Sequence, residues 1–186
     1  MEWSVLFLGS SGAGKTCAIR AISDVDVVST QAVATDGTSV TMDLGIMNLE
    51  GNNRLVLHGA PGQERHALAW ESLVRQVRGV VLLVDLCRQD PVADLAHYLD
   101  RIRDACQGAA PPLVIGVTHG ERVTRVSFND LRVFLRESAK DLGGAKLPLL
   151  RVDARQKKDI QILLLTLMSM LEFVERFPNG RSIPAC

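Results

Sequence analysis

A glycine-rich segment near the beginning of the chain constrains the fold more than any other feature of the sequence. Residues 9–16 read GSSGAGKT, which fits the pattern G-x-x-x-x-G-K-[ST] of a phosphate-binding loop. An apolar run at residues 5–8 precedes the loop and indicates a buried strand, and residues 17–22 after it read as a helix. Because strand, loop and helix follow in the order that such a loop requires, the segment predicts phosphate binding within an α/β fold.

The chemistry of the loop assigns roles to its residues. Backbone N–H groups of a glycine-rich turn at a helix N-terminus attract an oxyanion, because that end of the helix is partially positive. We expect Lys15 to reach the outer phosphates and the Thr16 hydroxyl to ligate Mg²⁺. The other residues expected to contact the nucleotide here are Gly9, Ser10, Ser11, Gly12, Ala13, Gly14 and Cys17.

The composition fits a single domain. The chain has 186 residues with 21 basic and 21 acidic side chains, so its formal net charge is zero and nothing in it indicates a nucleic-acid surface. The longest apolar stretch, residues 162–174, is too short and too interrupted for a membrane span. Four isolated cysteines indicate reduced thiols and a cytoplasmic protein. We expect one domain over residues 1–176 and a tail at residues 177–186.

Strand and helix patterns alternate along the chain, which predicts a three-layer α/β/α fold around a mostly parallel six-stranded sheet. Gly51 lies in a predicted hairpin turn, so one edge strand is expected to be antiparallel. Helices are expected to begin at Asp90, at Ser127 and near residue 157, with the second ending at residues 143–144. The predicted strands cover residues 5–8, 40–49, 54–58, 80–85, 113–117 and 147–152.

A second motif, GAPGQER at residues 59–65, follows the third predicted strand. The N–H of a glycine at that place can donate to a terminal phosphate, which is the role expected of Gly62. A glutamine beside it can orient an attacking water, which is the catalytic role expected of Gln63 together with Lys15. The motif is an ordinary turn when taken alone, but one hairpin downstream of a phosphate-binding loop it indicates nucleotide hydrolysis.

The order of these motifs resembles that of small Ras-like GTPases, over about residues 4–176. The chain is most similar to prokaryotic groups, the MglA-like proteins and others with the sequence PGQER, whose members work with Roadblock/LC7 proteins. The resemblance implies a Ras-like P-loop G domain that binds GTP and GDP with Mg²⁺ and switches conformation. It also implies GTP hydrolysis by in-line attack of a water.

The resemblance implies further ligand residues. Residues 39–44 are similar to the switch I strand, so the hydroxyl of Thr38 or Ser39 is expected to bind Mg²⁺ beside that of Thr16. Residues 118–121 stand where the guanine-reading [NT]-K-x-D stands, and residues 153–155 where S-A-K stands. The residues expected to contact the base are therefore Thr118, His119, Glu121, Asp153, Ala154 and Arg155.

Three positions depart from the family pattern. Gly59 stands where D-x-x-G has its aspartate, so no carboxylate at that position can hold a water on Mg²⁺. Glu121 replaces the aspartate that accepts from the guanine N1–H and N2–H, with one more methylene of reach. Ser11 stands where many relatives have glycine and is expected to crowd the terminal phosphate. We therefore expect slow intrinsic hydrolysis that a partner accelerates.

Two other functions remain open at this point. A degenerate G domain would bind nucleotide as a non-catalytic scaffold, and a P-loop ATPase or kinase would use Asp85, at the end of an apolar strand, as its metal ligand. Trp70 fits either a buried position or a partner surface. An effector is expected at the switch regions. The apolar last helix is expected to cover the core, and it also offers a surface for a regulator or for a second copy in a homodimer.

Overall fold

The computed structural model describes residues 2–33, 39–61, 67–107, 110–121, 126–138 and 147–176. Within these residues a seven-stranded sheet has the order β2-β3-β4-β1-β5-β6-β7. Strand β3 is antiparallel to both its neighbours, and the other pairs are parallel. The strands are β1 (Glu2–Leu8), β2 (Val28–Val33), β3 (Ser39–Leu49), β4 (Asn53–Gly59), β5 (Gly79–Asp85), β6 (Leu113–Thr118) and β7 (Leu149–Arg151).

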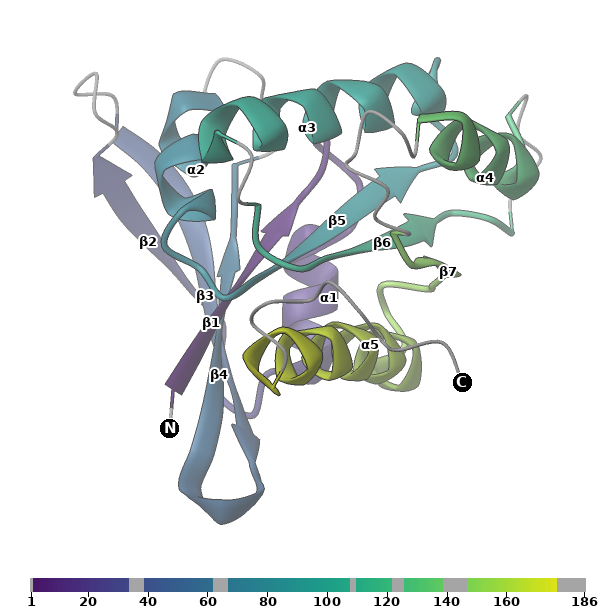
Figure 1. Ribbon diagram of the computed structural model, residues 1–186. Coiled ribbons are helices and arrows are strands. Elements are labelled where there is room, and N and C mark those ends of the chain that lie inside the picture. Colours follow the sequence, from purple (N-terminus) through teal and green to yellow (C-terminus); the bar gives the residue numbers. More distant parts are fainter. Residues whose placement is uncertain are drawn as a thin grey trace.

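Helices cover both faces of the sheet, which confirms the predicted three-layer α/β fold. Figure 1 shows α2, α3 and α4 on one face and α1 and α5 on the other. A hydrophobic cluster lies beneath each set, and β5 is buried along its whole length because it contributes to both clusters. The helices are α1 (Lys15–Ile22), α2 (Ala67–Val74), α3 (Pro91–Cys106), α4 (Phe128–Glu137) and α5 (Lys157–Arg176).

The sheet has one strand more than the six predicted. Strand β2 pairs with the outer side of β3, so the antiparallel strand β3 is second from the edge and not at it. The predicted hairpin between β3 and β4 is confirmed, with the short 3-10 turn Glu50–Asn52 at its tip. Strand β2 was not predicted because it is a short, largely exposed strand with no apolar run, VSTQAV.

The predicted starts of two helices are confirmed, and each has a side-chain cap. The Asp90 side chain accepts a hydrogen bond from the backbone N–H of Ala93 at 2.9 Å, with proline at the first helical position of α3. Ser127 and Asp130 form the reciprocal capping box of α4. Helix α4 ends earlier than predicted, at Glu137 with its cap at Ser138, and residues 143–144 lie outside the described part of the chain.

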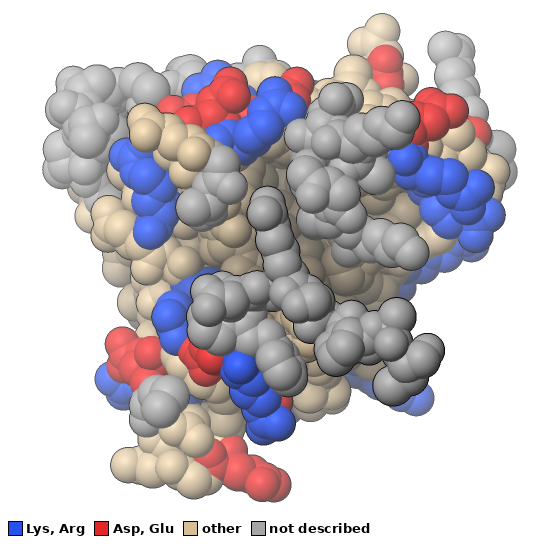
Figure 2. All heavy atoms as spheres, viewed as in Figure 1, with Lys and Arg blue, Asp and Glu red and all other residues tan. Residues whose placement is uncertain are grey.

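Trp70 resolves one alternative left by the sequence. Its side chain is 3% exposed and lies against Tyr98, with ring centroids 5.8 Å apart, so it packs inward and not against a partner. On the face shown in Figure 2, basic and acidic side chains are interspersed. No helix in the described ranges combines the length and hydropathy that a bilayer crossing requires. The predicted tail at residues 177–186 falls outside the described residues.

Candidate functional site

The phosphate-binding loop lies between the end of β1 and the start of α1, at the edge of the sheet where the parallel strands end. Gly9 and Gly14 adopt φ angles of +138° and +96°, a region that side chains rarely enter. A Cβ on Gly9 would lie 2.3 Å from the carbonyl oxygen of Leu83, and one on Gly14 would lie 2.8 Å from the Cβ of Ala154. Both glycines are therefore required by the path of the loop.

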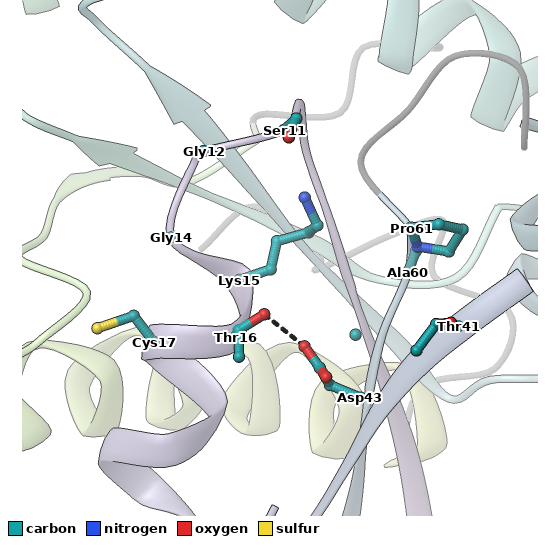
Figure 3. A pocket seen from close by; sticks show the side chains of 11 residues that line it. Ser11, Gly12, Gly14, Lys15, Thr16, Cys17, Thr41, Asp43, Ala60 and Pro61 are labelled. Carbon is teal, nitrogen blue, oxygen red and sulfur yellow. Dashed lines mark hydrogen bonds between the residues drawn. The ribbon is translucent and has the colours of Figure 1, made fainter. Parts of the chain in front are cut away.

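A pocket of about 420 Å³ opens between this loop and the ends of β3 and β4. Figure 3 shows Lys15, Thr16 and Asp43 around the space between the loop and Pro61. The pocket therefore brings six of the predicted loop residues together with parts of two strands, whereas Gly9, Ser10 and Ala13 do not line it. Its lining residues are Ser11, Gly12, Gly14, Lys15, Thr16, Cys17, Thr41, Asp43, Gly59, Ala60 and Pro61.

Lys15 is the buried charge of the pocket. Its side chain is 9% exposed, and its ammonium donates to the carbonyl oxygens of Gly9 and Ser10, each at 2.8 Å. Burial lowers the pKa of Lys15 from 10.5 to about 8, and the nearby negative charge of Asp43 partly opposes this shift. The lysine is still mostly protonated at pH 7, so a partly desolvated cation is held under the loop where the phosphates are expected.

Asp43 is a residue that the sequence reasoning missed. It lies on β3, its Oδ2 accepts a hydrogen bond from the Thr16 hydroxyl, and its Oδ1 accepts one from the Ser29 hydroxyl at 3.0 Å. The sequence placed Asp43 in the switch I segment but assigned it no role. Its position depends on the register of β3 against β4, which no local motif encodes.

The residues predicted to read the base meet on the other side of the loop. Thr118 is 2% exposed, and its hydroxyl donates to the carbonyl oxygens of Ala13 at 3.1 Å and Val84 at 3.3 Å. Thr118 therefore links the end of β6 to the phosphate-binding loop by a hydrogen bond. Ala154 contacts the same loop at Gly14.

Charged side chains on the base side pair with one another. Arg155 forms a two-pronged ion pair with Asp153, with Nε–Oδ1 and Nη2–Oδ2 distances of 2.9 and 2.8 Å. These hydrogen bonds hold the pKa of the Asp153 carboxyl at about 2 and raise the pKa of the Arg155 guanidinium. The negative charge of Glu121 also raises the pKa of Arg155, and Glu121 is exposed.

His119 takes up a specific position beside this group. Its φ is +57°, and its Nδ1 lies 2.7 Å from the Oδ1 of Asp85, which also accepts from the backbone N–H of Cys87 at 2.8 Å. Together, Asp85, Cys87 and His119 offer ligand atoms within 4.8 Å of one another. The carboxylate of Asp85 therefore orients His119 and stabilises the turn after β5.

Several predicted site residues lie outside the described part of the chain. Gly62 and Gln63 belong to residues 62–66, and Thr38 belongs to residues 34–38. Ser39 begins β3, where its backbone pairs with Val33, but its side chain is not described. The roles assigned to these four residues stay predictions.

A glycine loop over a buried lysine, at the strand-end edge of a largely parallel sheet, defines a P-loop nucleotide-binding protein. Comparison of the sequence with protein families is more specific, because the sequence model described as "Ras family" matches residues 4–171. The chain therefore belongs to the Ras family of small GTPases, and it is a GTP-hydrolysing molecular switch of that class.

Individual relatives agree with this assignment. The GTP-binding protein YPT1 of Saccharomyces cerevisiae is 24% identical over 172 residues, which cover 91% of this chain and 79% of the yeast protein. The GTP-binding protein ypt1 of Schizosaccharomyces pombe is 26% identical over 181 residues, with 96% and 83% covered. The mouse Ras-related protein Rab-44 is 33% identical over 106 residues, which cover 55% of this chain but 10% of that much longer protein.

Proposed function

We propose that this Ras-family protein is a Mg²⁺-dependent GTP/GDP switch that selects guanine through Glu121 and hydrolyses GTP slowly without a partner. The phosphate pocket is the observation that supports this most directly. It places the Lys15 ammonium, the Thr16 hydroxyl and the glycine loop around one space of about 420 Å³. A triphosphate needs such an arrangement of a fixed cation, a metal ligand and a backbone cradle.

The oxygen atoms that line the pocket fit Mg²⁺. This cation prefers hard oxygen ligands, and the Thr16 hydroxyl stands with a carboxylate at the floor of the pocket. Thr16 would hold the cation together with the hydroxyl of Thr38 or Ser39. When bound, Mg²⁺ would neutralise charge that develops on the phosphates.

The chain's own residues would then share the remaining work. Lys15 would contact the outer phosphates, the Gly62 N–H would donate to the terminal phosphate, and Gln63 would orient the attacking water. Ser11 is exposed on the pocket lining, where its side chain would crowd the terminal phosphate. This crowding and the absence of a carboxylate at Gly59 are the reasons that we propose slow intrinsic hydrolysis.

A partner would complete the switch. The PGQER sequence supports a relationship to MglA-like proteins and thus a Roadblock/LC7-type regulator in the cytoplasm. An effector would bind the segments that the γ-phosphate orders, near residues 38–44 and 65–70. Helix α5 also exposes Ile162, Leu165 and Phe173, which would suit a regulator or a homodimer contact.

The geometry of the site affects the two alternative functions, the ATPase or kinase and the non-catalytic scaffold, differently. The ATPase or kinase interpretation required Asp85 as a metal ligand, but its carboxylate is engaged by His119 on the base side. The scaffold interpretation still rests on the three departures from the family pattern, at Gly59, Ser11 and Glu121. Nucleotide selectivity and hydrolysis separate all three.

Guanine selectivity is tested by titrating the purified protein with GDP and ADP. Glu121 would satisfy two donors of guanine, and a site built for such donors rejects a base that lacks them by on the order of 10⁴. We expect the Glu121→Ala variant to lose GDP affinity and keep whatever ADP affinity it has. Glu137→Ala, an exposed substitution on α4, is the matched control. Comparable GDP and ADP affinities in the wild type would overturn the GTPase proposal and favour an ATPase or kinase.

Hydrolysis is tested by single-turnover measurements on the wild type and on Gln63→Leu. We expect the wild type alone to turn over more slowly than about 1 s⁻¹, and an arginine supplied by a partner to add roughly 10³–10⁵-fold. The Gln63→Leu substitution should remove both the intrinsic and the stimulated rate. Equal rates in the two proteins would remove Gln63 from the mechanism and favour the scaffold.

A further inference from the structure

The carboxylate of Asp43 lies beside the place where this chain lacks one. Asp43 on β3 and Gly59 at the end of β4 are directly opposite each other in the antiparallel pair. Side chains of such a cross-strand pair leave the sheet on the same face. A Cβ built on Gly59 would lie 3.1 Å from the Cβ of Asp43 and 3.6 Å from its Oδ2. Side chains at positions 43 and 59 would therefore occupy the same small region of the pocket.

Two hydrogen bonds fix the orientation of the Asp43 carboxylate. The Thr16 hydroxyl donates to Oδ2, and Figure 3 shows this contact at the floor of the pocket. A hydroxyl has one proton, so donation to Asp43 leaves the lone pairs of Thr16 free for a cation. The Ser29 hydroxyl, 3.0 Å from Oδ1, fixes the other side of the carboxylate.

We propose that Asp43 supplies, from the neighbouring strand, the carboxylate that this chain lacks at Gly59, and that it positions Thr16 and the hydrated Mg²⁺ at the phosphates. This inference rests on the proposed Mg²⁺-dependent nucleotide binding. Asp43 is a positioning residue, because it acts through the Thr16 hydroxyl and the water shell of the cation. Partners of metal ligands of this kind typically change metal affinity by about 10–100-fold when they are lost.

The packing around Gly59 explains why one carboxylate excludes the other. In addition to the Asp43 contact, a Cβ at Gly59 would meet the Cδ1 of Ile19 at 2.9 Å. An aspartate there would also set two negative charges side by side at the pocket floor. The φ angle of Gly59 lies outside the left-handed region, so sterics and charge, and not the backbone, oppose a side chain. Removing the Asp43 carboxylate and the Ile19 δ-carbon should therefore relieve the charge repulsion and the closest of these contacts, leaving the contact with the Cβ of residue 43.

The first measurement is the dissociation rate of a fluorescent GDP analogue as free Mg²⁺ is varied, for the wild type and Asp43→Asn. Asparagine keeps an acceptor for Thr16 but removes the charge. We expect the Mg²⁺ concentration that half-slows release to rise about tenfold or more, with the rate in EDTA unchanged. Asp24→Asn is the matched control, since Asp24 caps the backbone N–H of Asn48 at 2.7 Å outside the pocket.

The second measurement uses a variant in which the carboxylate is moved from position 43 to position 59. The variant Asp43→Ala/Ile19→Val should show the raised Mg²⁺ midpoint, and adding Gly59→Asp should return the midpoint towards that of the wild type. A purely structural role for Asp43 would not allow this recovery. Ile19→Val alone controls for the lost methyl group in the core.

The outcomes distinguish this inference from the function on which it rests. Equal Mg²⁺ midpoints in the wild type and Asp43→Asn would overturn the role of Asp43 and leave the GTPase proposal standing. No recovery on adding Gly59→Asp to a variant that still retains GDP would also overturn it. A wild type that retains no GDP at any Mg²⁺ concentration would overturn the proposed function, and this inference with it.

Discussion

At the phosphate end of the proposed nucleotide site, the Lys15 ammonium is held by two backbone carbonyls, whereas at the base end charged side chains hold each other. Lys15 is 9% exposed, but the side chain of Arg155 is 69% exposed. A buried cation with neutral partners attracts an anionic ligand strongly, because the surroundings screen its field poorly. Paired surface charges contribute little energy.

This difference predicts where affinity and where selectivity arise. The phosphate end should provide most of the binding energy for any nucleotide, since it offers the desolvated charge. The base end should discriminate between nucleotides without adding much to folding. Substitutions at the two ends should therefore differ in size and in kind, and three of them test the comparison in order of decreasing effect.

The largest effect is expected for Lys15→Ala. It removes the buried ammonium that faces the phosphates, so GDP retention during purification should be abolished and the dissociation constant should rise by on the order of 10³ or more. Isothermal titration with GDP measures the change. Lys158→Ala, an exposed lysine on α5, is the control and should bind as the wild type does. Unchanged GDP affinity in Lys15→Ala would refute the phosphate-loop assignment.

A smaller effect is expected on the pH dependence of folding. The folded pKa of Lys15 is about 8 against 10.5 when unfolded, so between these values the unfolded chain binds more protons. The unfolding free energy of the nucleotide-free wild type should therefore rise with pH over that window, by about 3 kcal/mol relative to Lys15→Met. Below pH 8 the two proteins should differ by a constant amount.

Urea unfolding of both nucleotide-free proteins at pH 7, 9 and 10.5 checks this prediction. Taking the difference between the two proteins removes the contribution of every other titrating group. A difference that does not change with pH would mean that Lys15 is well solvated without nucleotide. The contrast between the two ends of the site would then disappear.

The sequence predicted the phosphate end better than its surroundings, for a physical reason. The loop from Gly9 to Thr16 works through its own backbone and two side chains, so a local motif describes it fully. Asp43 could not be assigned a role in the same way, because its contact with Thr16 spans 27 positions and depends on strand register. Strand β2 was not predicted from the sequence, because an exposed edge strand carries no strong apolar pattern.

The base end could be predicted from the sequence only in part. The family resemblance predicted that Thr118 and Ala154 contact the base, and the structure shows in addition that both lie against the phosphate-binding loop. The pairing of His119 with Asp85 did not follow, because the resemblance has a lysine at position 119 and says nothing of a histidine's partner. Side-chain pairs that are particular to one chain need the structure to reveal them.

The smallest effect is expected for Asp153→Asn, at the base end. The ion pair with Arg155 lies on the surface, so its loss should change the melting temperature by no more than about 2 °C. The pKa of Asp153 is lowered to about 2 from 3.8, so any stability that the pair contributes is fully present above pH 3.8 and is lost as the pH falls through 2. Melting temperatures of the wild type and Asp153→Asn should therefore differ by a small and constant amount, within about 2 °C, from pH 5 to 9. A large destabilisation at pH 7 would show that the base-end charges support the fold, which would contradict the division of roles between the two ends.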